Sequence, residues 1–184
     1  MGTIDTLSLL LNTGTIRTGS ITVAEPFAVN DDIVLEAAIL NISAPLEADR
    51  IALSTDGQLI LPQAAVDQNG GNDVNLFTAN ELRIVAARGV GSSAAPVFIQ
   101  TRNAATQTVE VQTQGAAGIY LVARGDLAIG GVSAIPGTAD IVGLRTGSAG
   151  NMAVTVLSGG LTVHEVVDAT GGDIVFTTES VEIL

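Results

Sequence analysis

The sequence predicts an all-β fold in which short strands stack as the coils of a β-solenoid. Apolar segments of four or five residues recur along the chain, mostly with β-branched residues or alternating polarity. Turn-forming Gly, Asn, Asp, Ser and Thr residues separate them, and no helical period is sustained. The segments return at intervals of about 20–23 residues, a period typical of one solenoid coil per repeat. An antiparallel β-sandwich with short hairpins is the alternative.

Each predicted strand is a short run of this kind between turn residues. The predicted strands are Ser20–Val23, Ile33–Ala37, Arg50–Leu53, Gln58–Leu61, Val74–Phe77, Leu82–Ala86, Thr108–Gln112, Gly118–Val122, Ala153–Leu157, Leu161–Val163 and Asp173–Thr177.

The repeat is defined by apolar residues that each begin a pair of strands. Their intervals are 18, 23, 23 and 22 residues for the series Ile33, Ile51, Val74, Val97 and Ile119. The next interval, to Val154, is 35 residues, which predicts either an irregular coil or an insertion near Gly137–Gly150, and Ile174 follows 20 residues later. Two similar turns, Gly71-Asn72-Asp73-Val74 and Gly171-Gly172-Asp173-Ile174, support the repeat. A single coil cannot bury its apolar face, whereas stacked coils bury a continuous column of Val, Ile and Leu.

Composition narrows the class of protein. The chain has 184 residues, of which 47% are hydrophobic, 14% charged and 3% aromatic, so residues 1–184 are expected to form one solenoid with an aliphatic core. The net charge is −12 and lysine is absent, which argues against nucleic-acid binding and against attraction to an anionic membrane. No apolar run is long enough for membrane insertion as a helix. The absence of cysteine excludes disulfides and thiolate metal sites.

The stretch from Gly71 to Gly131 carries a family resemblance. It contains Asn80-Glu81-Leu82-Arg83-Ile84-Val85-Ala86-Ala87-Arg88-Gly89-Val90-Gly91-Ser92, then Gly118-Ile119-Tyr120-Leu121, then Gly125-Asp126-Leu127-Ala128-Ile129-Gly130-Gly131. This resembles the repeat region of large bacterial exoproteins of the filamentous-haemagglutinin and autotransporter-adhesin type, with Ala128 in place of a usual Thr. The resemblance implies a right-handed parallel β-helix at the cell surface or outside the cell. The chain is then expected to be a segment of a larger surface protein, with neighbouring coils of that protein as its first partners.

One motif points to adhesion. Arg124-Gly125-Asp126 spells the tripeptide that integrins recognise, which would attach the protein to a host cell through an exposed turn. The same Gly-Asp pair also belongs to the turn of the family repeat, which explains two of the three residues without any ligand.

The sequence gives little support for metal binding or for catalysis. Calcium could use oxygen ligands from Asp31, Asp32, Asp73, Asp140 and Asp173, but the calcium-roll and EF-hand spacings are absent and turn capping explains most of these positions. The sole histidine, His164, lies beside Glu165, and no Gly-x-Ser-x-Gly element accompanies it. We therefore expect no catalytic residues, no cofactor and no specific metal site.

The expected function is a non-catalytic structural or adhesive segment, a stalk or a displayed binding face, that meets a glycan or protein of a host or neighbouring cell. A carbohydrate-active β-helix, binding or cleaving polysaccharide, is one alternative, although one Tyr and no Trp give a poor sugar-stacking surface. A self-assembling extracellular filament subunit is another, because apolar terminal segments such as Val181–Leu184 predict end-to-end association.

Overall fold

All regular structure in the computed structural model is β-strand. The structure describes residues 19–56, 58–60 and 76–184, and twenty strands lie within them. The described part of the chain contains no helix long and apolar enough to span a membrane. The predicted all-β class is confirmed.

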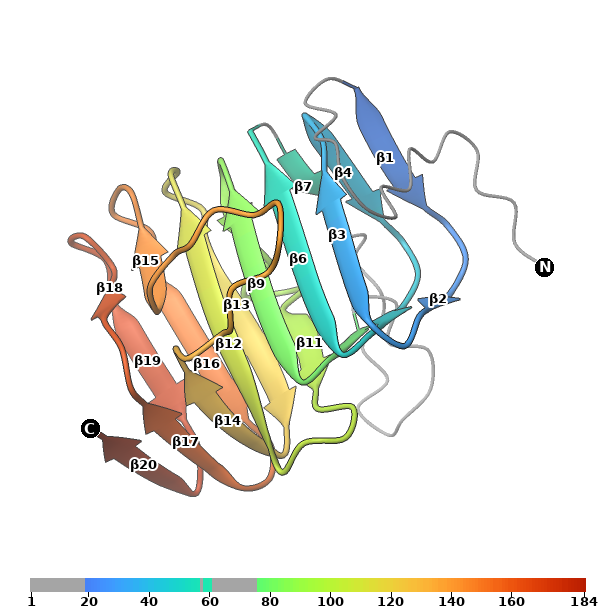
Figure 1. Cartoon of the computed structure of the whole chain (residues 1–184). Helices are drawn as coiled ribbons and strands as arrows, with labels where there is room; N and C mark the ends of the chain where they lie inside the picture. Colours follow the sequence, from blue (N-terminus) through green and yellow to red (C-terminus); the bar gives the residue numbers. More distant parts are fainter. Residues whose placement is uncertain (1–18, 57, 61–75) are drawn as a thin grey trace.

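The strands form three sheets, and every pairing between described strands is parallel (Figure 1). Sheet A contains β1 (Ser20–Val23), β4 (Ile39–Ile42) and β7 (Gln58–Ile60). Sheet B contains β2 (Phe27–Ala28), β5 (Leu46–Glu47), β8 (Leu76–Thr78), β10 (Gly89–Val90), β11 (Val97–Gln100), β13 (Gly118–Arg124), β16 (Met152–Val156) and β19 (Ile174–Thr177). Sheet C contains β3 (Asp32–Glu36), β6 (Arg50–Thr55), β9 (Glu81–Ala86), β12 (Thr106–Thr113), β14 (Asp126–Ile129), β15 (Leu144–Thr146), β17 (Gly160–Val163), β18 (Val167–Asp168) and β20 (Ser180–Ile183). The antiparallel hairpins required by the sandwich alternative do not occur among these strands.

The chain passes repeatedly from one sheet to the next, and we call each pass a layer. Layers 1 to 7 are β1–β3, β4–β6, β7–β9, β10–β12, β13–β15, β16–β18 and β19–β20. Figure 1 shows the layers side by side, with the N-terminal layers at one end of the stack and the C terminus at the other. Parallel strands of consecutive layers lie about 4.8 Å apart, so each layer hydrogen-bonds to the layers on either side.

The core consists of columns of aliphatic side chains in register through the layers. One column in sheet C runs through Ile33, Ile51, Leu82, Val109, Ile129, Val163 and Ile183. Its members are at most 6% exposed except for the last, Ile183, which is 74% exposed. Alternation along each strand turns these residues inward because successive side chains point to opposite faces. The last member of the column, in the final layer, is therefore left exposed.

The predicted coil length of about 20–23 residues, with one longer interval before Val154, is wrong for several layers. The pairing of Ile33 with Ile51, 18 residues apart, is as predicted, but Ile51 pairs with Leu82. Val97 pairs with Leu121, two residues beyond the expected Ile119. The predicted series mixes two sheets, since its first members lie in sheet C and its later ones in sheet B. Turns of different length separate the layers, so the register advances by 18 to 34 residues per layer, the largest step being from Ile129 to Val163.

The insertion exists but lies earlier than predicted. It occupies residues 130–143, between β14 and β15, where the expectation was Gly137–Gly150. Most predicted strands coincide with observed ones to within one or two residues. The prediction missed several short strands, among them β2, β5 and β18. The turn Gly71-Asn72-Asp73-Val74 lies outside the described residues.

Candidate functional site

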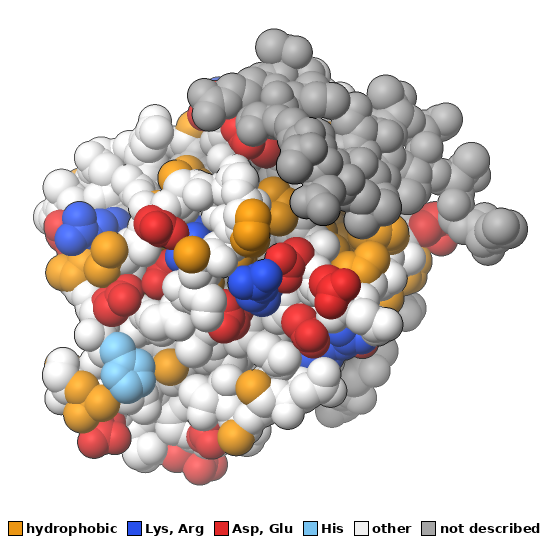
Figure 2. All heavy atoms as spheres, viewed as in Figure 1, with side chains coloured by type: hydrophobic (Ala, Val, Ile, Leu, Met, Phe, Trp, Pro, Cys, Tyr) orange, Lys and Arg blue, Asp and Glu red, His pale blue; other side chains and the backbone are white. Residues whose placement is uncertain are grey.

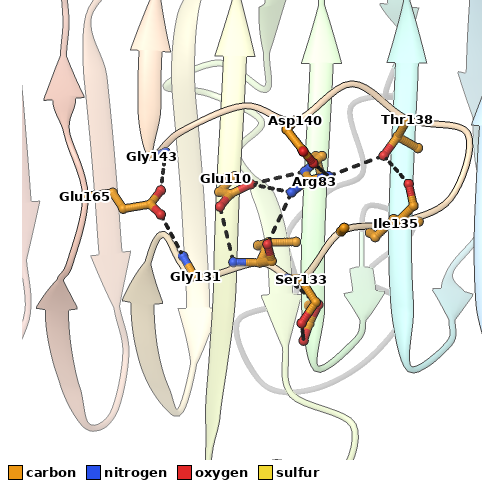
Figure 3. A network of polar contacts seen from close by, with 12 residues as sticks. Arg83, Glu110, Gly131, Ser133, Ile135, Thr138, Asp140, Gly143 and Glu165 are labelled. Atoms are coloured by element: carbon orange, nitrogen blue, oxygen red, sulfur yellow. Dashed lines mark hydrogen bonds and ion pairs between the residues drawn. The ribbon is translucent and has the colours of Figure 1, made fainter.

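The densest polar network of the described residues lies where the insertion folds back over sheet C. We call residues 130–143 the strap. Figure 1 shows it as the long connection in front of β6, β9 and β12, and Figure 3 shows its polar contacts from close by. Two glycines begin the strap and one ends it, at positive φ angles of 95°, 79° and 66° for Gly130, Gly131 and Gly143. Such angles are readily adopted by glycine and let the chain turn sharply out of β14 and back into β15.

A buried ion pair lies under the strap. Arg83 on β9 donates from Nε and Nη2 to Oε2 of Glu110 on β12, at 3.1 and 2.9 Å, and both side chains are 3% exposed. Arg83 also donates from Nη2 to the Val132 carbonyl (3.2 Å) and from Nη1 to Asp140 Oδ1 (3.1 Å) and Thr138 Oγ1 (3.3 Å). The guanidinium therefore joins two strands to three positions of the strap.

Glu110 also holds the strap directly. Its Oε1 accepts a hydrogen bond from the Val132 N–H at 3.2 Å. Burial raises the pKa of Glu110, whereas hydrogen bonding and charge from Arg83 and the bond from Val132 lower it; burial prevails, so the pKa lies above its ordinary value.

Two further glutamates hold the beginning and the end of the strap. Glu81 on β9 accepts from the N–H and the hydroxyl of Ser133, both at 2.9 Å. Glu165, two residues after β17, accepts from the N–H of Gly131 (3.3 Å) and of Gly143 (2.8 Å). One carboxylate therefore closes the base of the loop, which Figure 3 shows at the point where the strap leaves and rejoins the sheet.

The strap also packs against sheet C through apolar contacts. Val132 and Ile135 form a small cluster with Ala52 of β6, and Val34 of β3 packs against it. Ala52, Arg83 and Glu110 are in register on the outer face of the sheet, and each is 2% exposed. An outer face of a sheet normally contacts water, so the strap converts this part of it into a second, smaller core.

The arrangement is suited to holding structure. The carboxylates of Glu81, Glu110 and Glu165 accept hydrogen bonds from the strap, and the Arg83 guanidinium donates to it. Figure 2 shows acidic side chains spread over the same face, with basic side chains fewer among them. Within the described ranges, no group of three or more His, Cys, Asp or Glu side chains is placed to hold a metal ion.

The adhesion motif lies at the corner between sheets B and C. Arg124 ends β13, Gly125 takes a φ of 104° in the turn, and Asp126 begins β14. Asp126 is exposed, and its Oδ1 accepts a hydrogen bond from the Gly160 N–H of the next layer at 2.8 Å. The guanidinium carbon of Arg124 lies 5.6 Å from the centre of the Phe98 ring. The turn thus has a structural role, and integrin recognition stays a prediction.

Among the described residues, the calcium candidates do not form a group that could hold a metal ion. Asp32 pairs with Arg50 on the neighbouring strand, with 2.7 Å between Oδ1 and Nε. Asp140, which belongs to the strap, accepts a hydrogen bond from Arg83 on β9. Asp173 lies in the turn before β19, with its N–H bonded to Asn151 Oδ1. Asp31 lies in the bend directly before β3, whose first residue is Asp32. Asp73 is outside the described residues. Calcium binding stays untested.

His164 and Glu165 lie next to each other but have different surroundings. His164 is exposed directly after β17 and bonds through its backbone N–H to the Ile129 carbonyl. Its neighbour Glu165 closes the base of the strap, a role that the sequence analysis did not assign.

Sequence reasoning also missed the cross-layer contacts of the arginines. Arg102, in the turn after β11, bonds to Asn30, Glu47 and Asp49 of earlier layers. Arg50 reaches the strap through the Ala134 carbonyl at 3.2 Å. The only signals in the sequence were the long interval before Val154 and single charges at outward strand positions, which look like ordinary solvent-exposed residues.

Comparison of the chain with protein-family models, with curated proteins and with solved structures found no significant match.

Proposed function

We propose that the chain is a right-handed parallel β-solenoid that serves as a structural segment of an extracellular or cell-surface bacterial protein. The observation that carries the proposal is the stacking of parallel layers with aliphatic columns in register from Ile33 to Ile183. Such a stack is a stiff spacer whose length depends on the number of layers. The bacterial surface setting rests on the resemblance of Gly71–Gly131 to adhesin repeats.

The polar side chains support a structural role. Glu81, Arg83, Glu110 and Glu165 bond to the strap, and Arg102 bonds across layers. These contacts hold the strap to the sheet and join one layer to another. A stalk or scaffold requires that they stay, since each contact ties one layer to another.

The last layer offers a surface for a further β-coil. No described strand covers the outer edges of β19 and β20, and Val181 and Ile183 are 47% and 74% exposed. An uncovered strand edge has free N–H and C=O groups that pair readily with another strand. We propose that this edge accepts a neighbouring coil of a longer protein or, for the isolated chain, a second copy.

Association of the isolated chain tests the edge. The net charge of −12 opposes contact between copies, and salt screens this repulsion to a range of about 8 Å at physiological ionic strength. Light scattering across a salt series should show association that increases with salt. Val181→Lys/Ile183→Lys should abolish it, because lysines at an edge disfavour strand pairing.

A matched control uses two exposed apolar residues away from this edge. Val142→Lys/Leu157→Lys adds the same charge at residues that are 50% and 56% exposed, and it should associate more than the edge variant at every salt level. A monomer at all salt concentrations, with full hydrogen-exchange protection of the β20 amides, would contradict the proposed edge pairing.

The functional alternatives need separate assays. No turnover is expected on acidic or neutral polysaccharides, and cleavage that is lost on substitution of one Asp or Glu would overturn the non-catalytic assignment. For adhesion, beads coated with the chain should be compared with beads carrying Asp126→Glu, which keeps the charge. Equal binding of integrin-bearing cells by both would assign Arg124-Gly125-Asp126 to the turn alone.

A further inference from the structure

The strap crosses several layers, although it is inserted in one. It belongs to layer 5, between β14 and β15, yet it bonds to Arg50 in layer 2, to Glu81 and Arg83 in layer 3 and to Glu110 in layer 4. Glu165 of layer 6 closes its base. Figure 3 shows these partners on neighbouring strands beneath one continuous loop.

Contacts of this range are unusual for a stack. In a repeat protein each unit touches only its neighbours, so that opening can begin at one end and proceed layer by layer. A loop that bonds to four layers besides its own must detach before any one of them can open separately. Its Val132 and Ile135 side chains would also lose the apolar contact with Ala52.

We infer that the strap is a brace that makes layers 2 to 6 open as one cooperative unit. Layer 7 lies outside the braced block and opens by itself, because among the described strands β19 and β20 pair only with β16 and β17, and both expose their apolar residues. The inference rests on the contacts of the strap and does not depend on the biological role of the chain.

Native-state hydrogen exchange of the full chain, measured over a series of low denaturant concentrations, tests the brace. In the wild-type protein the slowest amides of β6, β9 and β12 should share one denaturant slope and one opening constant, while β20 amides exchange with a smaller slope. Arg83→Met/Glu110→Leu removes both buried charges together and detaches the middle of the strap. The β6 amides should then exchange about tenfold or more faster, because several hydrogen bonds to charged groups are lost. Their denaturant slope should also become smaller than that of the β12 amides.

Two other variants keep the result interpretable. Asn151→Ala removes a bond between adjacent layers, to the Asp173 N–H, and should leave the shared slope of β6 and β12 unchanged. Glu81→Ala removes the two Ser133 contacts and should separate the two slopes partly, so it decides the matter if the double variant does not fold. Different slopes for β6 and β12 in the wild type, or a shared slope retained in the strap variants, would overturn the inference.

Discussion

Replacing Arg83 by methionine separates the contribution of the buried ion pair to stability from the contribution of the hydrophobic packing around it. Methionine fills much of the aliphatic part of arginine but offers no donor. Glu110, with its side chain 3% exposed, would keep only the Val132 N–H at 3.2 Å. Breaking a buried pair by removing one partner costs about 3–5 kcal/mol. We expect Arg83→Met to lower the free energy of unfolding by this amount, a factor of about 10² or more in the unfolding equilibrium.

A second substitution shows whether the unpaired charge is the cause. In Arg83→Met/Glu110→Leu no charge is left buried, although the Val132 N–H and carbonyl both lose a partner. We expect the double variant to recover about 2 kcal/mol relative to Arg83→Met, since apolar replacements of buried pairs are often tolerated. Urea unfolding followed by circular dichroism gives the midpoints and slopes for both.

The matched control is the more exposed pair of Asp32 and Arg50. Their side chains are 25% and 29% exposed, and such pairs contribute about 0–1 kcal/mol. Asp32→Asn should therefore change the free energy of unfolding by less than about 1 kcal/mol. The reasoning fails if Arg83→Met costs no more than this control, or if adding Glu110→Leu gives no recovery.

Two other predictions concern the titration of Glu110 and the close stacking of layers. Because burial raises the pKa of Glu110, the folded state binds more protons than the unfolded state between the ordinary value of 4.5 and the raised one. The stability of the wild type relative to Glu110→Gln should thus fall as pH rises through this window. Paired urea titrations measure this difference. A wild-type advantage that grows with pH would show that Arg83 lowers the pKa of Glu110 more than burial raises it. Gly118 and Gly137 both have positive φ, at 86° and 83°, but an added Cβ meets the Asn151 carbonyl only at Gly118. Gly137→Ala should cost about 1–2 kcal/mol and Gly118→Ala clearly more, and equal thermal midpoints would contradict this packing.

The sequence alone determined the all-β class and the positions of the longer strands. In β9, Leu82 and Ile84 lie in the aliphatic core, whereas Arg83 between them bonds to the strap on the outer side of the sheet. Such local alternation survives in any arrangement of the strands because it follows from the geometry of a single strand. The class was therefore predictable, and so was the presence of an insertion before Val154.

The pairing of layers could not be read from the sequence. Ile51 has apolar residues both 23 and 31 positions later, and each is an acceptable partner for a column of aliphatic side chains. The actual partner is Leu82. A parallel register is thus a property of the whole stack, whereas the predicted period was built from spacing alone.

The position of the strap over sheet C is determined by the tertiary structure. Arg83 and Glu110 occupy outward strand positions, where a charged residue normally contacts water, and 27 positions of sequence separate them. The parallel pairing of β9 with β12 puts them on adjacent rungs, and the strap then covers them. Burial of an outward charge depends on where a distant loop comes to lie. The sequence therefore determined the all-β class and the longer strands, whereas the folding of the loop turned two ordinary surface charges into the buried centre of a brace.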